Sequence, residues 1–339
     1  MLWRLAMKSM AVDLGTAITV IYVKDRGIVL REPSIAAVTD DRRQRVVAVG
    51  EEAKRMLGRT PEGIKSVRPM RDGVIADFRI TEEMLRMFVK NALSIAGFAS
   101  GRFNMVICVP CNITYSEKRA VEDAARHAGA REAYVAEEPV AAAIGAGLQV
   151  NQPRGNMIVD IGGGTSDIAV ITMGGTAVAR SLRVGGVKMD DAIIHYMKRQ
   201  YGVIIGEKTA EEIKIQAGTA IEHKNGPSVM VRGRDSVSGM PANVEVTSRE
   251  LCIAMKDQID TIVAEIKSVL AETPPELVAD IMQYGITLAG GGALLNDLPE
   301  RLRYETGIPV RIAEHPMDCV ALGAGRIVEE LEHIKRGVR

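Results

Sequence analysis

The chain has 339 residues, of which 47% are hydrophobic and 25% are charged, and its 43 basic residues balance its 43 acidic residues. This length fits about two domains of ordinary size, and the composition is that of a soluble globular protein. A net charge of zero gives no long-range attraction to nucleic acid, so we expect no DNA or RNA partner, whereas self-association is permitted.

The chain begins with MLWRLAMKSM, in which apolar side chains alternate with Arg4 and Lys8. It lacks the apolar core of a signal peptide, and no apolar run reaches the roughly 20 residues that span a bilayer, so we expect a cytoplasmic protein. A short basic amphipathic segment with a tryptophan suits a membrane surface, and the alternative is a frayed terminus. The candidate membrane contacts are Leu2, Trp3 and Leu5. Phe98 in the later segment IAGFASGRF is a second candidate, for which the alternative is a loop that faces the core.

Two segments resemble each other, namely SMAVDLGTAITVIYV at 9–23 and NMIVDIGGGTSDIAVI at 156–171. In each, an apolar run ends in an aspartate, and a turn of glycine and threonine leads into a second apolar run. This pattern predicts a β-hairpin that carries a carboxylate at its edge. Because the pattern occurs twice, the chain is predicted to consist of two related halves.

Strands and helices alternate between and after these segments. We predict a buried strand at 103–110, a helix at 116–130 capped by Ser116, and an Ala-rich helix that follows a turn at Glu138 and Pro139. Sheets covered by helices follow from such alternation. In the second half we expect a helix at 209–218 capped by Thr209, a long amphipathic helix at 248–272, a strand, glycine turn and helix at 285–307, and a final helix at 318–334.

Four cysteines, Cys108, Cys111, Cys252 and Cys319, are too few for a disulfide framework in a chain of this length. The first two form a C-x-x-C pair, but no second pair or spaced histidine supplies further zinc ligands. We therefore interpret the pair as part of a buried strand that runs into a proline turn, and a redox pair is the alternative.

The two predicted turns combine the groups that a nucleoside triphosphate needs. Glycine N–H groups and threonine hydroxyls can donate to phosphate oxygens, and Asp13 and Asp160 can orient a hydrated Mg2+. One such turn alone would be interpreted as an ordinary hairpin, but two matched turns favour a nucleotide site. The candidate phosphate-binding residues are Gly15, Thr16, Gly162, Gly163, Gly164 and Thr165.

A third glycine cluster, Gly290-Gly291-Gly292, follows the apolar run ITLA. A strand, glycine turn and helix would aim helix N–H groups at the nucleoside, although a glycine triplet alone is a weak signal. Neither a Walker P-loop nor a dinucleotide-binding glycine motif is present. Glu138 is the candidate for orienting or deprotonating a hydrolytic water; taken alone, it would be interpreted as an exposed loop residue beside Glu137.

The order of these motifs, with EEPVAAAIGAGL, VDIGGGTSD, AEEIK and LAGGGALL, resembles the superfamily of actin, DnaK-type chaperones and sugar kinases. Within that superfamily the chain resembles the bacterial actins of the MreB and Mbl group across nearly its whole length. The segments RPMRDGVIADF, NITYSEKRA and TPPELVADI carry this resemblance.

The resemblance implies an α/β actin-like ATPase fold, in which two duplicated RNase H-like lobes hold Mg-ATP in the cleft between them. Lobe I would comprise 1–150 with a subdomain inserted at about 33–75. Lobe II would comprise 151–316 with a subdomain inserted at about 182–247, and 317–339 would form a helix that returns to lobe I.

The resemblance also implies roles for individual residues. Asp13 and Asp160 would serve Mg2+, and Glu138, with Asp160, would serve hydrolysis. Where the family usually has DLGTANT, this chain has Ile18 in place of asparagine, so a side-chain contact is lost at the first turn. The implied nucleotide-binding residues beyond the phosphate set above are Ala17, Ile18, Glu211, Lys214, Gly291, Gly292, Ala293 and Leu294.

In function, the resemblance implies a slow ATPase that polymerises with itself into paired protofilaments beneath the membrane and works with cell-wall elongation proteins to determine rod shape. A chaperone-type ATPase is an alternative, but it would need a further substrate-binding domain after the last helix. A sugar kinase would need a sugar pocket with a catalytic aspartate, for which we find no candidate. A non-polymerising scaffold of the same superfamily is the remaining alternative.

Overall fold

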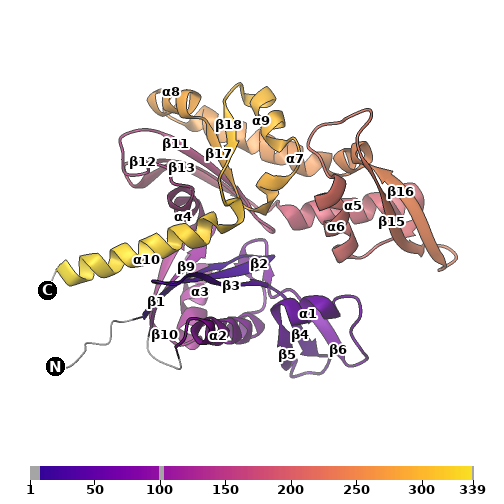
Figure 1. Ribbon diagram of the computed structural model, residues 1–339, viewed down its shortest axis with the longest axis horizontal. Helices are drawn as coiled ribbons and strands as arrows, with labels where there is room; N and C mark the ends of the chain where they lie inside the picture. Colours follow the sequence, from indigo (N-terminus) through magenta and orange to yellow (C-terminus); the bar gives the residue numbers. More distant parts are fainter. Residues whose placement is uncertain (1–7, 99–102, 338–339) are drawn as a thin grey trace.

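The computed structural model describes residues 8–98 and 103–337, with side chains to residue 331, and it contains two lobes that are each built on a five-stranded sheet (Figure 1). The strand orders are β10-β9-β1-β2-β3 and β13-β12-β11-β17-β18. In both sheets a central strand pairs antiparallel with the next strand of the chain and parallel with a later strand. The shared topology confirms the predicted duplication.

The first sheet consists of β1 (Lys8–Leu14), β2 (Ile18–Val23), β3 (Gly27–Pro33), β9 (Phe103–Val109) and β10 (Ala130–Glu137). The second sheet consists of β11 (Asn156–Ile161), β12 (Ser166–Thr172), β13 (Gly175–Leu182), β17 (Ile286–Ala289) and β18 (Val310–Ile312). The central strands β1, β9, β11, β12 and β17 are almost continuously apolar and buried, as expected for strands that are covered by helices on both faces.

Each lobe carries a smaller sheet inside the predicted insertions at 33–75 and 182–247 (Figure 1). The lobe boundaries themselves remain our division of the chain. The first insertion contains β4 (Ala36–Thr39), β5 (Val46–Val49), α1 (Gly50–Met56), β6 (Ile64–Val67), β7 (Met70–Arg71) and β8 (Val74–Ile75). The second contains α5 (Gly186–Tyr201), β14 (Val203–Ile204), α6 (Glu207–Ala217), β15 (Ser228–Asp235) and β16 (Pro241–Thr247).

The remaining helices cover the large sheets. The long helix predicted at 248–272 is present with those bounds, and its first turn is closed by a capping box between Thr247 and Glu250. These helices are α2 (Phe78–Ile95), α3 (Tyr115–His127), α4 (Glu138–Gly145), α7 (Ser248–Glu272), α8 (Pro275–Tyr284), α9 (Leu298–Thr306) and α10 (Cys319–Gly337), with the 3-10 turns η1 (Gly291–Leu294) and η2 (Pro316–Asp318).

Two predicted helix caps were wrong. Helix α3 is capped by Thr114 and not by Ser116, because the Thr114 hydroxyl accepts from the Glu117 N–H while the Glu117 carboxylate accepts from the Thr114 N–H at 2.7 Å. This reciprocal pair satisfies two donors at once, which a serine inside the first turn cannot do. Helix α6 begins at Glu207, before the predicted cap Thr209, and no side chain caps it.

The segment after β17 also differs from the prediction. The glycine cluster leads into the single 3-10 turn η1, and the α-helix α9 starts only at Leu298. The predicted α-helix N-terminus therefore does not directly follow Gly290. The backbone of the glycine cluster itself forms this edge of the cleft. The Gly290 N–H, which donates to the Pro316 carbonyl at 2.8 Å, holds that backbone in place.

An apolar cluster joins the two lobes. It contains Ala11 and Val106 from the first sheet, Ile158 and Ala169 from the second, and side chains of α4 and α10. In Figure 1, α10 runs between the two large sheets. Helix α10 also contacts the first large sheet, because the Tyr22 hydroxyl of β2 donates to Glu329 at 2.9 Å. All four cysteines are buried and unpaired within the described ranges.

Helices α4 and α10 cross with almost no side chain between their backbones. A Cβ atom at Gly323 would overlap the Ala141 carbonyl, and one at Gly145 would overlap the Cys319 carbonyl. Among the helices at residues 8–98 and 103–337, none is long and apolar enough to cross a bilayer.

We predict that Gly323→Ala lowers the free energy of unfolding by about 1–3 kcal/mol, because the methyl group forces apart two backbones in a close-packed core. Chemical denaturation measures this change. The matched control is Gly175→Ala, where the added Cβ meets only ordinary van der Waals contact at 3.8 Å. Equal stability of both variants and the parent protein would contradict the predicted overlap.

Candidate functional site

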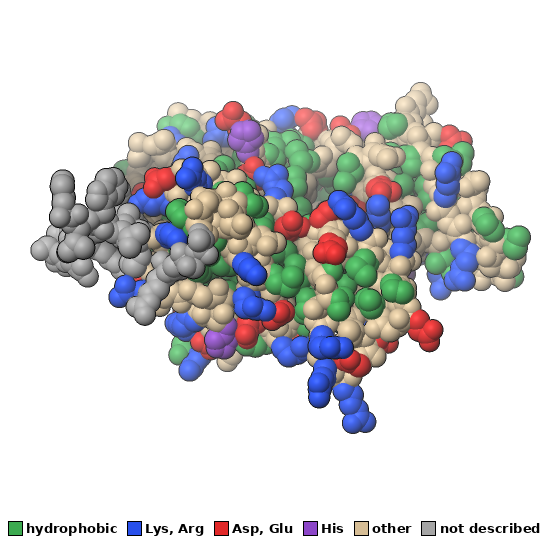
Figure 2. All heavy atoms as spheres, turned by 60° about the horizontal axis from the view of Figure 1, so that its bottom comes forward, with side chains coloured by type: hydrophobic (Ala, Val, Ile, Leu, Met, Phe, Trp, Pro, Cys, Tyr) green, Lys and Arg blue, Asp and Glu red, His purple; other side chains and the backbone are tan. Residues whose placement is uncertain are grey.

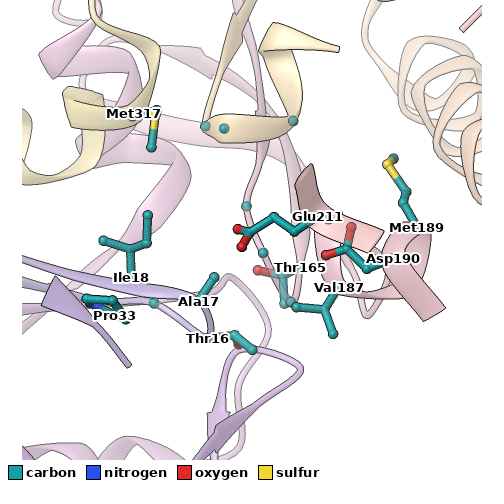
Figure 3. A pocket seen from close by; sticks show the side chains of 18 of the residues that line it. Thr16, Ala17, Ile18, Pro33, Thr165, Val187, Met189, Asp190, Glu211 and Met317 are labelled. Atoms are coloured by element: carbon teal, nitrogen blue, oxygen red, sulfur yellow. The ribbon is translucent and has the colours of Figure 1, made fainter. Parts of the chain in front are cut away.

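A cavity of about 440 Å³ lies between the lobes, and both predicted phosphate turns line it (Figure 3). Almost every predicted site residue is among its lining residues. The exception is Ala293, which is fully buried behind the cavity wall. The predicted residues that line the cavity are Asp13, Gly15, Thr16, Ala17, Ile18, Glu138, Asp160, Gly162, Gly163, Gly164, Thr165, Glu211, Lys214, Gly291, Gly292 and Leu294.

Parallel strands bring these residues together. Strand β1 runs parallel to β9, and β9 to β10, so Asp13 and Glu138 both lie at the carboxyl edge of the first sheet. In the second sheet β11 runs parallel to β17, which places Asp160 beside Ala289 and the glycine cluster. Ligands of open α/β sheets bind at the carboxyl ends of the strands, and here two such edges face each other.

The two turns present unused backbone donors. In the described part of the chain, the N–H groups of Thr16, Ala17, Gly163, Gly164 and Thr165 have no hydrogen-bond partner. Free N–H groups on consecutive turn residues form a concavity that favours anions. The cavity therefore has donors from both lobes for the oxygens of a phosphate chain.

The second turn must be glycine because the first turn lies directly against it. A Cβ atom at Gly163 would overlap the Ala17 side chain, and a Cβ atom at Gly164 would overlap the side chain of Thr16. The Thr16 hydroxyl in turn accepts from the Gly73 N–H at 2.9 Å, at the tip of the β7–β8 hairpin. The sequence showed the glycines, but only the fold shows that their small size also serves contact between the turns.

Four carboxylates lie close together at the inner end of the cavity: Asp13, Glu138 and Asp160 line its wall, and Asp167 lies beside Asp160 across the β11–β12 hairpin. Glu138, Asp160 and Asp167 are buried. Burial raises the pKa of Asp13 to about 7, and the Asp318 charge adds to this rise. Burial also raises the pKa of Glu138 and of Asp160, and the neighbouring carboxylates raise both further by repulsion. Such a cluster favours binding of protons or a cation.

Asp167 was not given a role from the sequence, although it stands in the quoted segment VDIGGGTSD. It pairs with Asp160 across the β11–β12 hairpin, so both side chains occupy the same face of the sheet. Burial raises its pKa, and the Cys111 N–H, which donates to Asp167 at 3.1 Å, partly offsets that rise. The two-residue period of a strand could have placed Asp167 near the site once the hairpin register was known.

The donor set fits Mg2+ that retains water. Carboxylates and phosphate oxygens are the hard ligands that Mg2+ prefers, and it commonly binds proteins through only one or two carboxylates. Within residues 8–98 and 103–337, no three Asp, Glu, His or Cys side chains converge on one ion. Asp13 and Asp160 therefore fit the predicted role of orienting a hydrated ion.

The outer end of the cavity is formed by α5, α6 and η2. The Glu211 carboxylate points into the cavity, and Ile18 and Met317 point toward one another (Figure 3). The Lys214 ammonium lies 2.8 Å from the Asp190 carboxylate and donates to the Gly186 carbonyl at 3.0 Å. Burial raises the pKa of Asp190 to about 6 despite the lowering effect of Lys214.

Ion pairs bridge the lobes around this cavity, and sequence reasoning missed them because the partners are distant in the chain. Lys54 of α1 contacts Glu211 of α6 at 2.9 Å. Arg68 contacts Glu207 at 2.9 Å, and Arg31 pairs with Asp318. The partners are partly exposed, so each pair adds little stability alone. The pairs of Lys54 and Arg68 connect the two small subdomains, and the pair of Arg31 connects β3 to η2.

Of the predicted membrane contacts, the structure describes only Phe98. Leu2, Trp3 and Leu5 lie outside the described residues. Phe98 is half-buried, packs against the first-lobe core, and has the Lys8 ammonium 4.3 Å from its ring centre. Its ring is therefore already in contact on two sides, and among the described residues of this segment Ile95 is the exposed large apolar side chain.

Comparison with known proteins gives consistent matches. The profile of the family described as MreB/Mbl protein matches residues 7–336. The cell shape-determining protein Mbl of Bacillus subtilis is 48% identical over 97% of this chain and 98% of its own length. The cell shape-determining protein MreB of Escherichia coli is 47% identical over 95% of this chain and 94% of its own.

Solved structures show the same fold. The crystal structure of MreB 5 of Spiroplasma citri bound to AMPPNP has a TM-score of 0.91 and 34% identity, and the match covers 98% of this chain and 99% of that one. The MamK double helical filament has a TM-score of 0.79 at 24% identity, over 96% of this chain and 99% of that one, and shows likeness of fold alone. The fold is therefore actin-like.

We predict that the nucleotide-free protein loses stability as pH rises from about 4 to about 7. In this range the folded state holds a proton on Asp13, whose pKa is raised to about 7 from a value of 3.8, while the unfolded chain has lost it. Asp13→Asn should flatten this slope and raise the melting temperature at pH 8 by a few degrees. It should also weaken stabilisation by Mg-ATP.

Thermal denaturation across this pH range, with and without Mg-ATP, tests the prediction. The control is Asp257→Asn, which removes an exposed carboxylate on α7. A pH profile of Asp13→Asn that coincides with that of the parent protein would show that Asp13 does not hold the proton.

Proposed function

The chain belongs to the MreB/Mbl family, and from this premise we propose that it binds Mg-ATP between its lobes, hydrolyses it slowly, and polymerises into filaments at the inner face of the cell membrane that organise wall synthesis and rod shape. One observation carries the nucleotide site: two glycine turns with unpaired N–H groups face a single cavity that is lined by buried carboxylates. The MreB 5 structures are described as bound to AMPPNP and to ADP, which supports an adenine nucleotide here.

In this proposal, residues at different places around the cavity have different roles. Thr16 and Ala17 of the first turn, with Gly163, Gly164 and Thr165 of the second, donate N–H groups to phosphate oxygens, and Asp13 and Asp160 would hold the hydrated metal ion. A bound Mg2+ supplies positive charge that offsets the phosphates and the carboxylates. The glycine cluster and Leu294 border the nucleoside, and Glu211 offers a carboxylate to it.

Glu138 has the geometry of a group that handles water. It directly follows β10, begins α4 beside Pro139, and lies buried where it lines the cavity. Burial raises its pKa, and neighbouring carboxylates raise it further, so neutralising those carboxylates on ligand binding favours its ionised form. Its carboxylate can then accept a hydrogen bond or proton from a water that attacks the terminal phosphate.

Polymerisation is supported by family membership and by the relatives' description as cell shape-determining proteins. The surface charge does not oppose it. Acidic and basic side chains are interspersed over the face seen in Figure 2, and the net charge is zero. Paired protofilaments, wall-elongation partners and membrane contact through Leu2, Trp3 and Leu5 belong to the same proposal. Each short segment would bind weakly, so firm attachment would come from many copies along a filament.

We predict that Glu138→Ala retains Mg-ATP binding but slows phosphate release about a hundredfold or more, as expected for loss of a general base. Asp160→Ala should instead weaken Mg-ATP binding itself. Phosphate release and nucleotide titration measure the two effects separately. The matched control is Glu137→Ala, which removes the adjacent exposed carboxylate. Equal loss of binding in the Glu138 and Asp160 variants would remove the special role of Glu138.

We predict that the protein sediments as filaments with Mg-ATP and that anionic vesicles increase the sedimented fraction. Pelleting and electron microscopy, each with and without vesicles, measure this. A triple variant with alanine at Leu2, Trp3 and Leu5 should still form filaments but should lose the effect of vesicles, because it lacks the apolar contacts. A parent protein that stays monomeric at high concentration with Mg-ATP and vesicles would refute polymerisation.

A further inference from the structure

Ser34 lies behind the first phosphate turn, where the chain passes from β3 of the large sheet to β4 of the small one. Its side chain is fully buried. The Ser34 hydroxyl donates to the Gly15 carbonyl at 2.6 Å, and the Ser34 N–H donates to the Ala17 carbonyl at 2.9 Å. A single residue outside the turn thus binds two of its carbonyl groups.

The direction of the hydrogen bonds can be assigned. A serine hydroxyl has one proton, and the Gly15 carbonyl can only accept. The Thr19 hydroxyl, 2.9 Å from the Ser34 hydroxyl and also buried, must therefore donate to Ser34. The result is a short chain from Thr19 through Ser34 to Gly15, in which each donor has an acceptor.

This bond fixes the orientation of one peptide unit. In a trans peptide the C=O and the following N–H point in opposite directions. Because the Gly15 carbonyl points toward Ser34, the Thr16 N–H points away from Ser34. Thr16 lines the cavity, and its N–H has no partner in the part of the chain that the structure describes. Ser34 therefore sets the direction of a free donor.

The turn needs such a restraint because of its glycine. Rotation of the Gly15–Thr16 peptide changes ψ of Gly15 and φ of Thr16. Glycine leaves the first of these angles almost unrestrained, so the hydrogen bond from Ser34 adds to the restraint that the Thr16 side chain places on the second. Rotation would turn the Thr16 N–H out of the cavity and present a carbonyl oxygen in its place. A carbonyl there would repel a phosphate oxygen, whereas the Ser34 hydroxyl stabilises the orientation that attracts one.

We propose that Ser34 is a positioning residue for the triphosphate: it acts through the Gly15–Thr16 peptide and does not itself contact the ligand. The inference rests on the proposed Mg-ATP site. A residue with this role affects binding of the phosphate chain and leaves binding of the nucleoside unchanged, whereas a residue needed only for stability affects both or neither.

The test compares dissociation constants of Mg-ATP and adenosine for three variants of the full chain. Ser34→Ala removes the donor, and we expect Mg-ATP binding to weaken about fivefold to tenfold while adenosine binding changes less than about twofold. Ser34→Cys retains a weaker donor and should lie between. Thr19→Val is the matched control, since it removes a neighbouring buried hydroxyl and leaves the bond from Ser34 to Gly15 intact.

We expect both the Ser34→Ala and the Thr19→Val variants to have a lower melting temperature. A ratio of Mg-ATP to adenosine affinity that changes only in Ser34→Ala would support the positioning role. An unchanged ratio in Ser34→Ala, or the same change in Thr19→Val, would overturn it. If Ser34→Ala does not fold, the ratio in Ser34→Cys decides. A parent protein that binds adenosine but not Mg-ATP would refute the proposed function itself, and this inference with it.

Discussion

Repulsion among buried carboxylates is the constraint on which the site depends. Asp13, Glu138, Asp160 and Asp167 are brought together at the facing edges of two sheets, and burial disfavours their charged forms. Such an arrangement is stable only when protons or a cation balance it. The hydrophobic cores of the lobes hold the carboxylates in place. Folding therefore offsets the free-energy cost of bringing the carboxylates together, and the site is assembled before a ligand binds.

Carboxylates that repel one another must be held together by other contacts, and the two lobes are joined at three places. An apolar cluster joins the two large sheets on either side of α4 and α10, the glycine turns touch across the cavity, and ion pairs such as that of Lys54 with Glu211 connect the small subdomains. The exposed ion pairs are weak individually, and the apolar contacts are strong. The inner end of the cleft is therefore held more firmly than its outer end.

Local patterns allowed much of this architecture to be predicted from the sequence. The repeated hairpins, the helix at 248–272 and the gathering of the phosphate turns around one cavity all follow from short-range signals of glycine, aspartate and apolar periodicity. The cap of α3 was missed although its T-x-x-E pattern is also local. Ser34 and the Arg68–Glu207 pair could not be predicted, because each depends on the distance between segments that are far apart in the chain.

The contact between the glycine turns restricts how the two halves of the chain can change in evolution. Duplicated halves ordinarily drift apart, because a substitution in one copy has no bearing on the other. Here a side chain at Gly163 or Gly164 would overlap Ala17 or Thr16 of the other copy. A larger residue at either glycine therefore fits only if the residue opposite it becomes smaller or the backbone shifts, so sterics constrain the two turns together at this point.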